Sequence, residues 1–220
     1  VLAGLLSERT ADGYVFRVDL RLRPDPSSTP PVVAAPMALA YYESVGQNWE
    51  RMVWIKARAA AGDMKAAARF IDRMGSYVWR RNLDYWAIDD IQAIKRMINT
   101  KIGAVGLENP APDIKLGPGG IREIEFFVQT QQLILGGRNP VLRDNSTLGA
   151  MAALRDAGIV TGGTAADLSE AYKLLRDVEH RIQMRHDEQS HTIPADIDER
   201  TGVAALCGYS SLEAFDLDLM

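Results

Sequence analysis

From Tyr14 to Pro24, apolar and polar side chains alternate along the chain. One face is apolar and the other mostly charged, which is the period of a half-buried β-strand. The charged face carries one carboxylate, Asp19, among the guanidinium groups of Arg17, Arg21 and Arg23. A single acid among fixed cations suggests a place where a metal ion and phosphate oxygens meet. The alternative is a half-exposed strand whose charges pair with one another.

After a proline- and serine-rich loop at 24–31, a short return strand is expected at 32–35. The apolar spacing then changes to the three and four residues of amphipathic helices. Helices are predicted over residues 37–61, 64–74, 86–102, 121–135, 147–157, 165–186 and from 196 to the end of the chain. The pattern therefore predicts a mainly α (α+β) fold, in which a small β-element near the N-terminus precedes six to eight helices.

Composition narrows the class of protein. The 220 residues allow one large domain or two small ones, and 47% apolar residues are enough for a core. A net charge of −4 argues against general nucleic-acid binding. Residues 51–101, however, carry 11 basic and 5 acidic side chains, whereas residues 196–220 carry one basic and six acidic. A basic middle suits a phosphorylated ligand or an acidic partner.

The single cysteine, Cys207, allows no internal disulfide and fits a reducing cytoplasm, where a buried structural thiol is the default. No apolar run approaches the ~20 residues that span a bilayer, and no signal peptide is visible. His180, His186 and His191 have the wrong spacing for a metal site on one helix, so surface or capping roles are expected. A start without Met and an end within an amphipathic run suggest a fragment.

A glycine-rich turn, residues 114–120 (IKLGPGG), precedes the predicted helix at 121–135. Free backbone N–H groups at a helix N-terminus bind anions, and glycine allows close approach. Lys115, Gly119 and Gly120 are therefore candidate phosphate ligands, although the GK[ST] ending of a Walker motif is missing. The alternative is a plain helix start with a tight turn.

Two further charged residues border apolar stripes. Glu125 lies where an unpaired charge is costly, so it should pair with Arg122 or Lys115 or approach a metal. Lys56 lies close to the apolar side of its predicted helix and could reach a phosphate. The alternative for Lys56 is a side chain that extends along the helix edge to water.

Four motifs occur together in a fixed order. They are FRVDLRLRP at 16–24, WERMVWIKAR at 49–58, IKLGPGGIREIEFFVQ at 114–129 and DEQSHTIP at 187–194. In this order and spacing they resemble the bacterial glutamine synthetase adenylyltransferase/adenylyl-removing enzyme family. The resemblance covers most of the chain. The chain has the motif GGIREIEF rather than one of the GGITDIEF type. In this respect it is similar to the N-terminal half of these enzymes, which is the adenylyl-removing half.

The resemblance implies a function. Enzymes of this family have two nucleotidyltransferase halves: one removes AMP from a tyrosine of glutamine synthetase by phosphorolysis, giving ADP, and the other adds AMP from ATP. Each half has a β-polymerase-like catalytic domain followed by a helical bundle. Residues 1–110 would be the C-terminal part of such a catalytic domain, and residues 111–220 a truncated helical bundle. The implied partners are glutamine synthetase, the PII signal protein, ATP or ADP, and phosphate, in the cytoplasm, with no nucleic acid and no membrane.

The resemblance also assigns site residues. Asp19 matches the third Mg²⁺-binding aspartate of the family, whose other two come from an upstream GSDxD-type motif that this sequence lacks. The residues implied in nucleotide or phosphate binding are Arg21, Arg23, Lys56, Lys115, Gly119 and Gly120. Glu125 would form part of the site wall. With only one of three metal ligands, the isolated chain is expected to be inactive.

Two other functions remain open. The helical part could be a module that docks glutamine synthetase or the PII signal protein, with residues 51–101 and 196–220 as contact surfaces. A uridylyltransferase-like relative acting on another protein is the third possibility.

Overall fold

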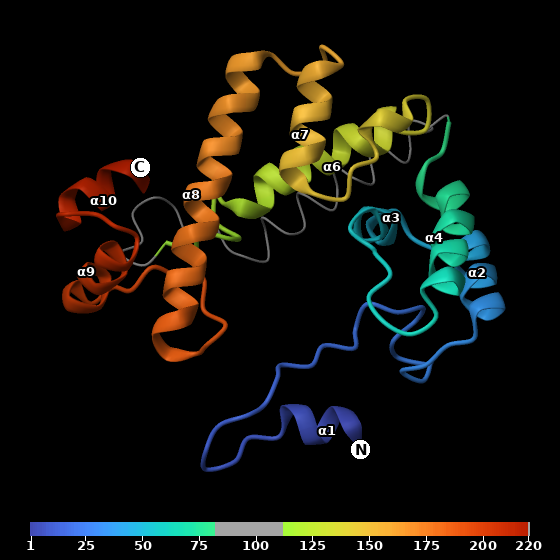
Figure 1. Ribbon diagram of the computed structural model, residues 1–220, viewed down its shortest axis with the longest axis horizontal. Coiled ribbons are helices and arrows are strands. Elements are labelled where there is room, and N and C mark those ends of the chain that lie inside the picture. Colours follow the sequence, from blue (N-terminus) through green and yellow to red (C-terminus); the bar gives the residue numbers. More distant parts are fainter. Residues whose placement is uncertain (82–111, 220) are drawn as a thin grey trace. The chain divides into compact units, whose positions relative to one another are not determined.

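The computed structural model describes residues 1–81 and 112–219. Within these ranges the regular structure is helical, apart from two isolated β-bridges (Figure 1). The helices are α1 (Leu2–Ser7), α2 (Ala35–Ser44), α3 (Asn48–Ile55), α4 (Met64–Val78), α6 (Ile121–Leu135), the 3₁₀ helix η1 (Pro140–Leu142), α7 (Thr147–Asp156), α8 (Gly162–His186), α9 (Ile197–Leu206) and α10 (Leu212–Leu219). The mainly α prediction is confirmed, whereas the β-polymerase-like fold stays a prediction.

The chain forms two compact units. Unit 1 comprises Val1–Gln47 and Ala59–Tyr77, and unit 2 comprises Asn48–Arg58 and Val78–Met220. The predicted domain boundary between 110 and 111 and the predicted helix at 86–102 lie outside the described residues. That division of the chain stays a prediction.

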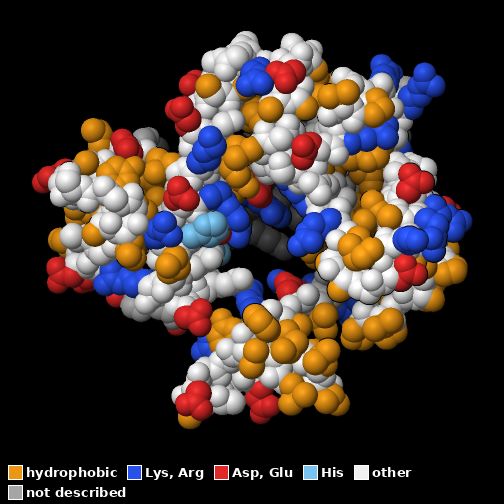
Figure 2. All heavy atoms as spheres, in the orientation of Figure 1, with side chains coloured by type: hydrophobic (Ala, Val, Ile, Leu, Met, Phe, Trp, Pro, Cys, Tyr) orange, Lys and Arg blue, Asp and Glu red, His pale blue; other side chains and the backbone are white. Residues whose placement is uncertain are grey.

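The predicted strand over residues 14–24 is wrong, because the described residues contain no β-strand. A strand needs a hydrogen-bonded neighbour, and this stretch makes only isolated backbone bonds such as Phe16 N–H to the Leu6 carbonyl. Its apolar face is consequently open, with Phe16 65% and Leu22 70% exposed. Figure 2 shows a further group of hydrophobic side chains over α1, where Leu2 and Leu5 are exposed. The return strand at 32–35 is also absent, and α2 already begins at Ala35.

The predicted helix at 37–61 is wrong as a single element, because the chain breaks between α2 and α3 near Gly46. In unit 1 a Cβ at Gly46 would lie 2.7 Å from both the Tyr42 carbonyl oxygen and the Tyr77 hydroxyl. That hydroxyl donates to the Gln47 carbonyl at 2.7 Å, and the Tyr42 and Tyr77 rings pack with centroids 5.3 Å apart. The close approach of Tyr77 to the backbone therefore requires glycine here.

Helix α4 continues to Val78, past Gly75, where the sequence pattern predicts its end. The last two residues of α4, Tyr77 and Val78, are both buried at 5% exposure. Burying two large side chains outweighs the cost of about 1 kcal/mol for a glycine inside a helix.

In unit 2, helices α6, α7 and α8 pack around a first apolar core (Figure 1). Its buried members are Ile124, Val128, Leu142, Ala150, Met151, Leu154, Val160 and Ala165. The prediction of a helix over 121–135 is confirmed by the bounds of α6, and the buried Ile121, Ile124 and Val128 form its predicted stripe. The prediction at 147–157 is confirmed by α7. Helix α8 begins earlier than predicted because the Thr161 side chain caps it, accepting from Thr164 N–H.

A second core lies along the C-terminal part of α8 and extends to α9 and α10. Its buried members are Ile114, Val178, Ile182, Ile193, Val203, Ala204 and Phe215. The predicted helix from 196 onward is two helices, which separate around Gly208 so that Phe215 can pack with no exposed surface. Since α8 contributes to both cores, it joins the two parts of unit 2. No helix of the described residues is both long and apolar enough to cross a membrane.

Candidate functional site

Asp19 lies in the extended stretch of unit 1 and is fully engaged with Arg21. Its carboxylate accepts from the Arg21 backbone N–H at 2.9 Å and from the guanidinium at 2.5–3.1 Å. Both side chains are exposed, Asp19 at 41% and Arg21 at 79%. The Arg21 hydrogen bonds, helped by the charge of Arg17, hold the pKa of Asp19 well below its ordinary value. Asp19 is therefore an ionised, accessible carboxylate at neutral pH.

Arg23 has a different role from Arg21. Its guanidinium donates to the backbone carbonyls of Leu20, Pro26 and Thr29, the last at 3.1 Å. These bonds close the proline-rich loop, so the donors of Arg23 are used within its own segment.

Asp19 alone does not make a magnesium site. In the part of the chain that the structure describes, no group of three or more His, Cys, Asp or Glu side chains is arranged to hold a metal ion. Mg²⁺ binds through carboxylates and retained waters, and Asp19 could supply one such ligand if Arg21 moved from it. The described residues thus fit one ligand of a magnesium ion, and the remaining ligands would have to come from elsewhere.

The glycine-rich turn of unit 2 provides few open donors. Gly119 has φ +72°, and its N–H donates to the Glu123 carboxylate at 3.1 Å. The N–H groups of Gly120, Ile121 and Arg122 donate to carbonyls of residues 117, 114 and 115 at 2.9–3.0 Å. The first donors of α6 are thus satisfied by the chain itself, as in a capped helix start.

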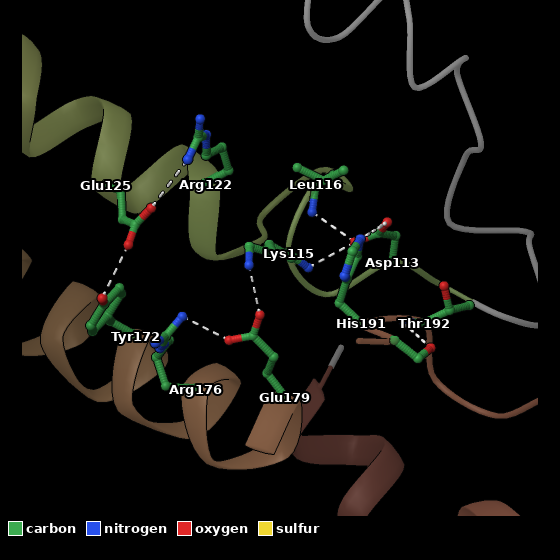
Figure 3. A network of polar contacts seen from close by, with 11 residues as sticks. Asp113, Lys115, Leu116, Arg122, Glu125, Tyr172, Arg176, Glu179, His191 and Thr192 are labelled. Atoms are coloured by element: carbon green, nitrogen blue, oxygen red, sulfur yellow. Dashed lines mark hydrogen bonds and ion pairs between the residues drawn. The ribbon is translucent and has the colours of Figure 1, made fainter. Parts of the chain in front are cut away.

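Lys115 points from this turn towards α8 (Figure 3). Its Nζ lies 3.0 Å from Oε1 of Glu179, and Nη1 of Arg176 lies 2.7 Å from Oε2. The Glu179 side chain is only 2% exposed, whereas its two cations are about one-third exposed. A buried carboxylate needs such partners, so Lys115 fixes the turn against α8.

Glu125, on α6, faces Tyr172 of α8 (Figure 3). The Tyr172 hydroxyl donates to Oε1 of Glu125 at 3.2 Å, and Arg122 lies 3.8 Å from Oε2. One of the two predicted pairings of Glu125, that with Arg122, is therefore present, although it is loose. Burial raises the pKa of Tyr172.

Lys56 follows the last residue of α3 and reaches α7. Its Nζ donates to the Thr147 hydroxyl at 2.8 Å, and the residue is partly buried. Burial lowers the pKa of Lys56, while the charges of Glu125 and Asp144 oppose that shift. Lys56 and Glu125, 69 positions apart in the numbering, thus share one polar region of unit 2.

A second pair of motifs meets beside the turn. His191 Nε2 lies 3.4 Å from Asp113 Oδ2 (Figure 3), and backbone bonds join Ile114 to His191 and Ile193 to Pro112. Asp113 also accepts from Lys115 N–H and Leu116 N–H at 2.9 and 2.7 Å. The IKLGPGG and DEQSHTIP motifs are therefore one structural feature.

Sequence reasoning missed Glu179, Tyr172 and Thr147 as members of this polar region. Tyr172, Leu175 and Val178 follow the three- and four-residue spacing of one helix face in α8, and Glu179 directly follows Val178. A carboxylate next to a buried stripe was the available signal for Glu179. For Thr147 the sequence gave no such signal, because threonine is common at the start of a helix.

Two family models match the chain. The model for glutamate-ammonia ligase adenylyltransferase matches residues 1–73, and that for GlnD PII-uridylyltransferase matches residues 92–219. Bifunctional glutamine synthetase adenylyltransferase/adenylyl-removing enzymes are similar over nearly the whole chain: 58% identical in Caulobacter vibrioides over 98% of it, 53% in Rhizobium meliloti over 97%, and 51% in Bartonella henselae over 100%.

The chain belongs to this adenylyltransferase/adenylyl-removing enzyme family. It spans 22% of the length of each of these three relatives. The uridylyltransferase model covers the part of the chain that contains α6–α10, so this part is similar to GlnD PII-uridylyltransferase. The names of its members describe bifunctional enzymes that are adenylyltransferases and adenylyl-removing enzymes.

Proposed function

We propose that the protein removes AMP from adenylylated glutamine synthetase by phosphorolysis, giving ADP, within an enzyme whose other half adds AMP from ATP. The observation that carries this proposal is the 58% identity to an adenylyltransferase/adenylyl-removing enzyme over 98% of the chain. The GGIREIEF motif at 119–126 supports the removing half in particular. Residues 1–110 would then belong to the catalytic domain and residues 111–220 to a helical bundle.

In this proposal Asp19 supplies one carboxylate to Mg²⁺, together with ligands from the rest of the enzyme. The metal ion, when bound, offsets negative charge on the reacting phosphates. The low pKa of Asp19 keeps the carboxylate ionised, as a metal ligand must be. Arg21, which pairs with Asp19 in the structure, would be free to donate to a phosphate oxygen if Asp19 bound a metal ion instead.

The other predicted phosphate ligands differ in how many of their N–H donors are free to bind a phosphate. Arg23, Lys115, Gly119 and Gly120 already donate to groups of the protein. Each would have to exchange that partner for a phosphate. They remain predicted phosphate ligands, with Glu125 as a predicted part of the site wall.

The test is Asp19→Asn in the full-length enzyme. We expect AMP removal to fall about 10²- to 10⁴-fold, because an amide is a poor ligand for Mg²⁺, while AMP addition by the other half is unchanged. Asp12→Asn is the matched control, since Asp12 is an exposed aspartate of the same unit. Unchanged removal in Asp19→Asn would contradict the assignment of Asp19.

A second candidate function is docking of glutamine synthetase or the PII signal protein. It is favoured by the acidic side chains on α9 and α10, at the left of Figure 2, of which Asp198 and Glu213 are exposed. Other acids there have internal partners: Asp216 pairs with Arg200, and Asp218 accepts from the Tyr209 hydroxyl. Binding of either protein in the absence of nucleotide, lost on combined Asp198→Lys and Glu213→Lys substitution, would support docking.

A further inference from the structure

Lys56 and Lys115 are both candidate phosphate ligands by sequence, but their surroundings differ. Lys115 is paired with the buried carboxylate of Glu179 at 3.0 Å. Among the described residues no carboxylate forms an ion pair with Lys56, and its hydrogen bond goes to the neutral hydroxyl of Thr147. The positive charge of Lys115 is thus used inside the fold, whereas that of Lys56 is not.

A buried hydroxyl on α7 holds Lys56 in place. Thr147, only 5% exposed, accepts from Lys56 Nζ at 2.8 Å. Nearby, the Tyr172 hydroxyl of α8 donates to Glu125 of α6. The end of α3 is thus tied to α7 by the Lys56 ammonium group, in a region where α8 and α6 are also joined by a polar contact.

Such an ammonium group favours an anion. It has three N–H donors, of which Thr147 uses one, and the residue is partly buried. A partly desolvated cation that lacks a direct ion pair is costly, and an oxyanion that accepts its free donors offsets that cost. Glu125 and Asp144 act on Lys56 from beyond ion-pair distance, so they help keep it protonated without occupying its donors.

We propose that Lys56 binds a tetrahedral oxyanion of the phosphate class, and that Thr147 is its positioning residue. The site is argued from contacts within unit 2, and it rests on the proposed function only for the choice of phosphate as ligand. Lys115 pairs with Glu179, so Lys56 is the lysine of the two whose donors are available to this anion.

Acylation of lysines in the full-length protein tests the site. Trace labelling with acetic anhydride, quantified by peptide mass spectrometry, is compared in sodium phosphate and in sodium chloride of equal ionic strength. Phosphate should slow acylation of Lys56 about fivefold or more when the site is saturated, while Lys173, exposed on α8, changes less than about twofold. If phosphate slowed the acylation of Lys56 and of Lys173 by the same factor, the proposal would be overturned.

Variants separate binding from positioning. By calorimetric titration with orthophosphate, Lys56→Met should raise Kd about tenfold or more, because a charge-assisted hydrogen bond is lost. Lys173→Met, which removes the same charge, should change Kd less than about twofold. Thr147→Val should raise Kd about threefold or more, and Thr147→Ser should restore it. Equal weakening by the two lysine variants would contradict the site.

Two further arms identify the source of the phosphate and keep this site apart from that of Asp19. Protection of Lys56 by orthophosphate at concentrations where AMP and ADP have no effect would assign a free phosphate. Protection by ADP alone would assign a nucleotide phosphate at the same site, and protection by neither would overturn the site. Asp19→Asn should lose AMP removal but keep the protection of Lys56, so the two proposals fail separately.

Discussion

Asp19 and Glu179 are both carboxylates bound to arginine, but they lie in opposite settings. Asp19 contacts a residue two positions away in an exposed stretch of unit 1, and its side chain is 41% exposed. Glu179 is 2% exposed and joins α8 to a turn 64 positions away in the numbering. The same pairing chemistry therefore leaves one carboxylate available to a ligand and uses the other to hold the fold.

The largest effect that tests this contrast is on stability. Glu179→Ala should lower the free energy of unfolding by about 2–4 kcal/mol, because it leaves Lys115 and Arg176 without their counter-charge. This loss of stability is at the lower end of the range for breaking a buried ion pair, because Lys115 and Arg176 are both partly exposed to water. Urea denaturation measures the change. Glu170→Ala, on an exposed position of the same helix, should change it by less than about 0.5 kcal/mol.

Asp113→Ala should have an intermediate effect. Its carboxylate accepts from two backbone N–H groups and lies near His191, with its side chain 25% exposed. Loss of these bonds should lower the free energy of unfolding by about 1–2 kcal/mol. Hydrogen exchange should also rise first in the segments around Ile114 and Ile193. If exchange rose uniformly across the protein instead, the proposed link between the two segments would be incorrect.

Asp19→Ala should have only a small effect on stability, because an exposed local pair contributes little. Denaturation of the full-length protein under the conditions used for Glu179→Ala gives the direct comparison. A loss as large as that of Glu179→Ala would show that the two carboxylates do not differ as the structure indicates.

The smallest predicted change is in the pKa of one carboxyl group, that of Asp19. Arg21 lowers the pKa of Asp19, so Arg21→Gln should raise that pKa towards the ordinary value of 3.8. The sign follows because a depressed pKa reflects a favoured carboxylate, whose benefit is lost as the pH falls through the pKa of the folded state. Carbon-13 NMR of labelled aspartate measures the shift, with Arg17→Gln as a weaker perturbation. An unchanged pKa would mean that the pair does not persist in solution.

Local pattern predicted the helices of unit 2 well. The boundaries of α6 followed from the apolar stripe beginning at Ile121 and from Gly136 beyond its end. Pattern failed where the structure depends on residues distant in the sequence. The spacing of apolar residues continues across Gly46, but the Tyr77 ring, 31 positions later in the numbering, forces the break there. Alternation over residues 14–24 showed two unlike faces but could not supply the neighbouring strand that a sheet requires.

In the candidate site, too, the sequence predicted the local features but not those that depend on residues distant in the sequence. Residue type and motif identified Asp19, Lys56, Lys115 and Glu125 as charged residues of interest. The sequence could not distinguish Lys56 from Lys115, because their partners Thr147 and Glu179 lie 91 and 64 positions away. Burial of those partners decides which lysine has donors to spare, and burial depends on the packing of α7 and α8.

The start of α6 has one more consequence. The carboxylate of Glu123 already accepts a hydrogen bond from the Gly119 N–H, so a negative charge of the protein lies at the N-terminus of this helix. An incoming phosphate would meet a like charge at that turn and would have to expel it before binding. Phosphate binding is thereby disfavoured at the glycine-rich turn, although this turn resembles a phosphate loop by sequence. Lys56, which forms no ion pair with a carboxylate of the described residues, has no such negative charge bound to its ammonium group.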